Sequence, residues 1–93
     1  MTALRWSSDG QHLEIRGGMT VHETPALLAG LASRGGVTAV DLQGVTQVDS
    51  SALSVLLALS RAAGGATVTV HHAPPALRAL SDLYGLLTLF RVV

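Results

Sequence analysis

The sequence predicts a single α/β domain, residues 1–93, in which a mixed β-sheet packs against helices. Its 93 residues suit one domain with one core. A hydrophobic content of 48% with only 13% charged residues excludes a disordered chain. Short β-compatible segments alternate with segments of helical spacing in the order β-β-α-β-α-β-α. This order is typical of right-handed crossovers and of parallel pairing among the later strands.

Two short strands around a turn are expected at the N-terminus. Residues 3–17 read ALRWSSDGQHLEIRG, where Asp9-Gly10 is a strong hairpin signal. Apolar residues alternate with polar ones after this turn, as in a half-buried strand. The pair Gly17-Gly18 is expected to end the second strand.

Three helices are expected, and their ends are marked by familiar capping residues. The first lies within residues 20–36, where Thr24 is a good cap and Pro25 suits the first helical position; an earlier start near Val21 is the alternative. The second covers residues 50–63. The third begins at Pro74-Pro75 and continues through the segment ALRALSDLYGLL. Glycine pairs at 35–36 and 64–65 are expected to end the first two helices.

Two more strands are expected between the helices. Residues 37–45, VTAVDLQGV, form a short and mostly apolar run that is typical of a buried strand. Residues 66–72, ATVTVHH, alternate valine with threonine. The C-terminal segment TLFRVV, residues 88–93, is compatible with a final turn or with a short edge strand.

The second predicted helix is apolar on more than one side, which needs an explanation in a chain this small. At 100° per residue, Leu53 and Leu56 fall on the side that we expect to pack on the sheet. We interpret Ala52, Val55 and Leu59 as a second apolar face, nearly opposite the first. Either the third helix covers this face, or it stays exposed and docks on another protein. We favour docking, because an exposed apolar patch rimmed by polar groups commonly marks an interface.

A polar Asp-Ser-Ser stands in front of this helix. As the N-cap, Asp49 is expected to accept hydrogen bonds from the amides of Ser51 or Ala52, and its charge would meet the positive end of the helix dipole. Ser50 would then be the first helical residue, with its hydroxyl facing outward. On local physics alone, the three residues are simply an efficient cap. A phosphate on Ser50 would lie at a helix N-terminus, although the neighbouring Asp49 would repel it.

Composition excludes several classes of function. The net charge is zero and the arginines are scattered, so no basic run suggests nucleic acid or an anionic membrane. The densest apolar stretch, residues 52–59, is far shorter than the roughly 20 residues of a membrane span. The N-terminus lacks the apolar core of a signal peptide, and the chain has no cysteine. We therefore expect a cytoplasmic protein that does not insert into the membrane.

No catalytic or metal site is predicted, and no cofactor is expected. The adjacent His71 and His72 would point to opposite faces of a strand, which makes them a poor pair of metal ligands. A Ser-His-Asp set can be named from Ser50, His22 and Asp49, but the sequence has no Gly-x-Ser-x-Gly elbow. It also has no Gly-x-x-x-x-Gly-Lys loop for a nucleotide. The chain is therefore not expected to be an enzyme.

The segment VDLQGVTQVDSSALSVLLAL, residues 40–59, resembles the signature of the STAS domain family, which is found in bacterial anti-sigma factor antagonists. That signature is a strand, then Asp-Ser/Thr-x-Gly-Leu, then an apolar helix. Here Ala52 stands where the family usually has glycine. The resemblance covers nearly the whole chain. The segments LRW and LRALSDLYGLL are similar to the MlaB-type STAS subunits of bacterial phospholipid (Mla) ABC transporters.

The resemblance implies a STAS fold and a non-catalytic function. An MlaB-type subunit binds the cytoplasmic, MlaF-like ATPase of an ABC-type phospholipid transporter, in complex with a membrane permease. It supports the assembly and activity of a system that maintains outer-membrane lipid asymmetry, and it is peripheral to the inner membrane through its partner. Ser50 matches the position that is phosphorylated in anti-sigma antagonists. The alternative is therefore an anti-sigma factor antagonist regulated by phosphorylation at Ser50.

Under the docking hypothesis, the partner-binding residues combine a polar junction with apolar anchors. They are Asp49, Ser50, Ser51, Ala52, Val55, Leu59 and Tyr84. Tyr84 belongs to the set because its ring suits a surface that is partly wet. On this view, Leu59→Asp leaves the fold intact and abolishes co-purification with an ATPase.

Overall fold

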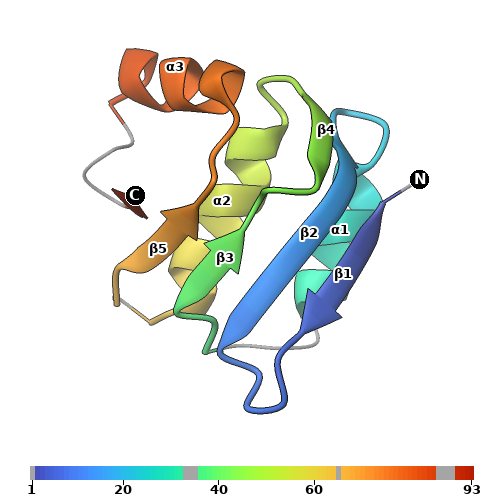
Figure 1. Ribbon diagram of the computed structural model, residues 1–93, viewed down its shortest axis with the longest axis vertical. Coiled ribbons are helices and arrows are strands. Elements are labelled where there is room, and N and C mark those ends of the chain that lie inside the picture. The colour runs from blue at the N-terminus through green and yellow to red at the C-terminus, as the bar shows by residue number, and fades with distance from the viewer. Residues whose placement is uncertain (1, 33–35, 65, 86–89) are drawn as a thin grey trace.

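The computed structural model describes residues 2–32, 36–64, 66–85 and 90–93. Its elements are β1 (Ala3–Trp6), β2 (His12–Met19), α1 (Thr24–Ala32), β3 (Ala39–Asp41), β4 (Val45–Val48), α2 (Ala52–Ala62), β5 (Val68–His71), α3 (Pro75–Leu83) and β6 (Phe90–Val92). Helices α1 and α2 lie behind a twisted sheet, and α3 lies across its upper end (Figure 1). The α/β class and the mixed sheet are confirmed, with β4 and β6 added to the expected order.

The sheet is built around β2. The strand order is β1-β2-β3-β5-β6, and β4 pairs with β2 off this path. Strand β1 is antiparallel to β2, whereas the other pairs are parallel. Strands β3 and β4 pair with successive stretches of β2, so β4 takes over where β3 ends. The carboxyl ends of β2 and β4 therefore meet at the same edge of the sheet.

The prediction that Gly17-Gly18 ends the second strand is wrong. Strand β2 continues to Met19, and its register against β4 shifts between the two glycines. Gly17 has φ 89°, a left-handed conformation that suits glycine in a bulge. The strand continues because Met19 is fully buried beyond the irregularity.

The prediction that Val55 and Leu59 are exposed is also wrong. Their exposed fractions are 0% and 1%, and that of Ala52 is 0%. At 100° per residue, the buried positions of α2 form one continuous arc of about 160° rather than two opposite faces. The buried residues of α2 share one apolar cluster with buried residues of the strands, and α2 also packs on the neighbouring α1 and on α3. Only the opposite side of α2 is open, where Ser54 and Arg61 are exposed.

The remaining elements largely agree with the sequence. The hairpin turn at Asp9-Gly10 is confirmed. Helix α1 begins at Thr24, one residue before the predicted start at Pro25, and the Thr24 hydroxyl donates to the Thr20 carbonyl instead of capping the helix. The C-terminal segment forms an edge strand, β6, parallel to β5. Helix α3 ends at Leu83, earlier than expected; residues 86–87, like the predicted stops at 35 and 65, lie outside the described residues. Within the described part of the chain, no helix has the length and apolar character required to span a membrane.

Candidate functional site

Two loops emerge side by side where β2 and β4 end. Met19 and Val48 are paired in the last register position of the two strands, and the Asp49 N–H donates to the Met19 carbonyl at 3.5 Å. The turn at residues 20–23 follows β2, and residues 49–51 follow β4. We call these two segments together the carboxyl edge. Figure 1 shows it at the top of the molecule, where β4 leads into α2.

Asp49 joins the two loops through its two carboxylate oxygens. The Ser51 N–H donates to Oδ1 at 2.8 Å, as the sequence predicted. The Val21 N–H, 28 residues away in the chain, donates to Oδ2 at 3.0 Å, which the sequence did not predict. The hydrogen bond from the Val21 amide, with further help from Ser51, outweighs desolvation and lowers the pKa of Asp49 below its ordinary value. Asp49 is therefore ionised at neutral pH.

The start of α2 differs from the prediction by two residues. The helix begins at Ala52 with Ser51 as its N-cap, and Ser50 lies in the preceding turn, exposed to solvent. The amides of Leu53 and Ser54 donate to the carbonyls three residues earlier, at 3.1 and 3.0 Å. These tight backbone bonds occupy amides that a helix N-terminus otherwise offers to an anion.

The turn after β2 is closed by its own side chains. Glu23 Oε1 accepts the Thr20 N–H at 3.1 Å and the Thr20 hydroxyl at 2.8 Å. The Thr24 hydroxyl donates to the Thr20 carbonyl at 2.9 Å. The hydroxyl and then the amide of Thr20 lower the pKa of Glu23. The Thr-x-x-Glu spacing is that of a capping box, a signal present in the sequence that the predicted helix start did not use. Only its glutamate half forms, because the Glu23 amide donates to the Thr20 carbonyl and not to the Thr20 hydroxyl.

The predicted partner-binding residues fall into three groups. Asp49, Ser50 and Ser51 lie together at the carboxyl edge, and Ser54, in the first turn of α2, is exposed. Ala52, Val55 and Leu59 are inside, as described above. Tyr84 is 59% exposed at the C-terminal end of α3, beside Leu83 at 76%. Figure 1 shows this end of α3 pointing away from the start of α2.

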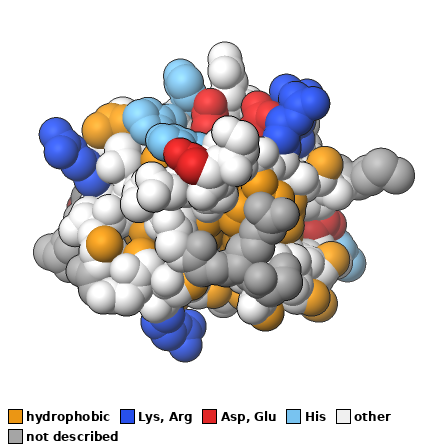
Figure 2. Space-filling view, turned by 90° about the horizontal axis from the view of Figure 1, so that it is seen from below, with side chains coloured by type: hydrophobic (Ala, Val, Ile, Leu, Met, Phe, Trp, Pro, Cys, Tyr) orange, Lys and Arg blue, Asp and Glu red, His pale blue; other side chains and the backbone are white. Residues whose placement is uncertain are grey.

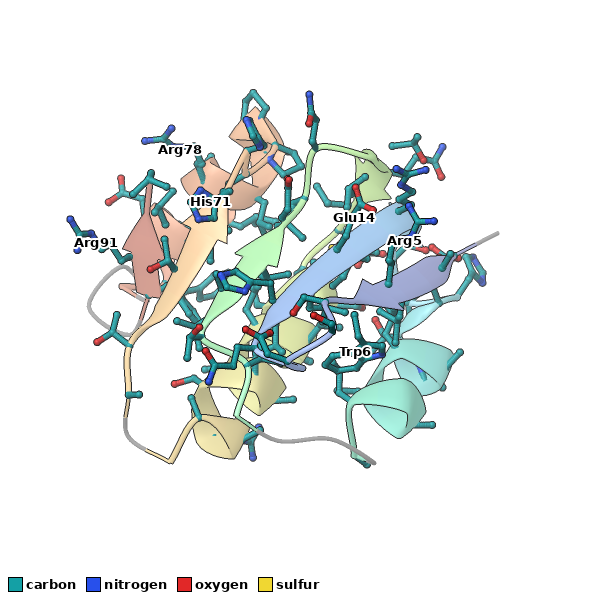
Figure 3. The ribbon with its side chains drawn as sticks, turned by 60° about the horizontal axis from the view of Figure 1, so that its bottom comes forward. Arg5, Trp6, Glu14, His71, Arg78 and Arg91 are labelled. Atoms are coloured by element: carbon teal, nitrogen blue, oxygen red, sulfur yellow. The ribbon has the colours of Figure 1, made fainter. Side chains whose placement is uncertain are left out.

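The face of the sheet opposite α1 and α2 (Figure 1) carries a row of polar side chains. The strand registers place Arg5, Glu14, Asp41 and His71 in one row across β1, β2, β3 and β5. A hollow of about 460 Å³ lies over this row. Figure 3 shows Arg5 beside Glu14 on neighbouring strands. In Figure 2, which shows the molecule from below, histidine and acidic side chains gather along the upper side of the picture, where the open face of the sheet lies, and the helix side at the bottom carries few charges.

The acids of this open face are already engaged. Arg16 Nε lies 3.2 Å from Glu14 Oε1, and His72 Nδ1 lies 3.0 Å from Asp41 Oδ1. Partial burial raises the pKa of Asp41, but hydrogen bonds from the Gln43 amide and from His72 outweigh it, so the pKa is lowered. Among the described residues, no cluster of three His, Cys, Asp or Glu side chains could hold a metal ion.

The architecture is that of the STAS fold of anti-sigma factor antagonists. An antagonist from Mycobacterium paratuberculosis is 22% identical, with a TM-score of 0.75 over 99% of this chain and 83% of its own. A putative antagonist from Thermotoga maritima is 12% identical, with a TM-score of 0.74 over 99% and 85%. The anti-sigma factor antagonist SpoIIAA in its unphosphorylated form is 16% identical, with a TM-score of 0.71 over 100% and 87%.

The sequence itself places the chain within this class. The family model described as "Mlab, STAS domain" matches residues 2–91. The chain therefore belongs to that family of STAS domains. Among curated proteins, no sequence gives a significant match.

Proposed function

We propose that this chain is a non-catalytic subunit that binds the cytoplasmic ATPase of an ABC-type phospholipid transporter and supports its assembly and activity. The description of the matching family, which names Mlab, supports this choice of partner. The carboxyl edge is the proposed contact. In the complex, the chain lies in the cytoplasm and reaches the membrane only through the ATPase and its permease.

The observation that carries this proposal is the exposed Ser50 on a rigid frame. Ser50 is open to solvent between β4 and α2, while Asp49 fixes the backbone on either side of it. A rigid site loses little conformational entropy on binding, so a small polar contact can be specific. Val55 and Leu59 support α2 from inside and have no direct contact with the partner in this proposal.

Binding to the ATPase is tested in two stages. The tagged chain is first captured from detergent-solubilised membranes of its native host, and its partner is identified by mass spectrometry. Binding of the purified partner is then measured for Ser50→Arg and for Ser8→Arg, which adds the same bulk and charge at the β1–β2 turn, at the opposite end of the sheet. We expect Ser50→Arg to weaken binding about tenfold or more and Ser8→Arg to change it little. Capture of no ABC ATPase, or equal binding of both variants, contradicts the proposal.

A second candidate is an anti-sigma factor antagonist regulated by phosphorylation at Ser50. The exposure of Ser50 and the similarity to solved antagonists favour it. A phosphate on Ser50 adds a charge of about −1.5 to −2 next to the ionised Asp49. This added charge would repel an acidic partner surface and disturb residues 49–51 between β4 and α2. Intact mass of the chain from native cells, with and without phosphatase, tests this candidate. A removable phosphate that is lost in Ser50→Ala supports it, and an unmodified chain under all growth conditions contradicts it.

A further inference from the structure

We propose that the turn at residues 20–23 is the second half of the docking surface, with Val21 as its apolar contact, and that the partner presents a basic side chain beside an apolar socket. This inference rests on the proposed function, because it names the chemistry of the ATPase surface. It also assigns Asp49 as the positioning residue that holds the two halves together.

Val21 is unusual in its exposure. It is 59% exposed, and it is one of only four large apolar residues that are exposed in the described part of the chain. The other three lie elsewhere: Leu83 and Tyr84 at the end of α3, and Val93 after β6. Val21 is thus the exposed large apolar residue that follows β2, and the Asp49 hydrogen bond ties it directly to the Ser50 segment.

The turn presents Val21 in a fixed position. Its backbone is held from one side by Asp49 Oδ2 and from the other by the Thr20–Glu23 hydrogen bonds. The Glu23 side chain also folds against Gly18, where an added Cβ would collide with the carboxylate. A surface that is ordered before binding loses less entropy when a partner covers it. The fixed turn therefore makes the isopropyl group of Val21 an effective contact.

Charge defines the partner's complementary surface. The segments at residues 19–24 and 48–54 contain the carboxylates of Glu23 and Asp49 and the imidazole of His22, but no Arg or Lys. Both carboxyl groups are ionised at neutral pH, because hydrogen bonds from the protein lower their pKa values. The two intramolecular bonds that Asp49 accepts leave lone pairs free, since a carboxylate offers about four acceptor positions. An Arg or Lys of the partner fits this anionic edge, whereas an acidic surface would be repelled.

The docking part is tested with two valines of similar exposure. Binding of the purified ATPase is measured for Val21→Ser and for Val93→Ser; Val93 is 54% exposed and follows β6, three strands away from β2. We expect Val21→Ser to weaken binding about tenfold, Val93→Ser to leave it unchanged, and binding of the unaltered chain to weaken as salt rises. If the unaltered chain binds and Val21→Ser binds equally well, this inference is overturned while the proposed function stands. If the unaltered chain binds no ATPase, the proposed function fails as well.

The positioning role of Asp49 is tested on the isolated chain by NMR. The amide resonances of Val21 and Ser51 should titrate together with a midpoint below the ordinary carboxyl pKa of 3.8, and Asp49→Asn should abolish this shared titration. The variant should stay folded and should bind the ATPase as weakly as Val21→Ser. A Val21 amide that does not follow the Asp49 carboxyl, or an Asp49→Asn variant that binds normally, overturns the assignment.

Discussion

Replacing Leu59 tests the packing of α2 most severely. Its side chain is 1% exposed and belongs to the main apolar cluster, together with Val55 and Leu56. Truncating a buried leucine to alanine costs about 2–5 kcal/mol, because the lost transfer free energy is joined by a cavity. A domain of this size has a total stability of about 5–15 kcal/mol, so Leu59→Ala should lose a large part of it. Leu59→Asp places an unpaired carboxylate in the same position and should prevent folding.

Urea unfolding followed by circular dichroism measures the effect of Leu59→Ala. The midpoint should fall clearly, and the melting temperature should drop by about 8–40 °C, since each 1 kcal/mol corresponds to about 4–8 °C in a domain this small. Ser54→Ala is the matched control on the exposed side of the same helix, and it should change stability by no more than about 0.5 kcal/mol. If Leu59→Ala unfolds like the unaltered chain, or if Leu59→Asp folds cooperatively, the burial of this side of α2 is refuted.

Three further substitutions probe the carboxyl edge and its surroundings. Ala52→Gly, at the fully buried start of α2, should lower the free energy of unfolding measured in urea by about 1 kcal/mol, since glycine disfavours helix. An unchanged free energy of unfolding would contradict a helical conformation at this position. The lowered pKa of Asp49 stabilises the folded state above pH 3.8, and this contribution is lost as the pH falls through the pKa that Asp49 has in the folded state. Asp49→Asn should therefore reduce the decrease in unfolding free energy between neutral and acid pH, and an identical decrease in both proteins would refute this. Gly18→Ala should push the Glu23 carboxylate away from Thr20 and accelerate hydrogen exchange of the Thr20 amide, whereas unchanged exchange would show that Glu23 does not protect it.

Local patterns predicted the secondary structure where a single period or cap dominates. The Asp9-Gly10 turn and the start of α1 to within one residue of Pro25 follow from residues close in sequence, so they could be read directly. Strand β4 was missed because its two central residues, Thr46 and Gln47, are polar and exposed, and it pairs with β2 on one side. Its existence depends on a distant strand, which a local pattern does not reveal.

The candidate site was predicted in part. The hydrogen bond from Ser51 to Asp49 follows from the capping geometry of neighbouring residues. The bond from Val21 to the same carboxylate joins residues 28 positions apart and needed the pairing of β2 with β4. The exposure of Val55 and Leu59 was misjudged because their directions on the helical wheel form one wide stripe with those of the other buried residues.

Site-specific crosslinking tests the central claim most directly, namely that the carboxyl edge touches the partner. The chain has no cysteine, so Ser50→Cys and Ser8→Cys each carry a single thiol for a photoactivatable probe. We predict that the probe at position 50 crosslinks to the ATPase and that the probe at position 8, at the far end of the sheet, does not. Crosslinking from position 8 alone, with none from position 50, would contradict the account.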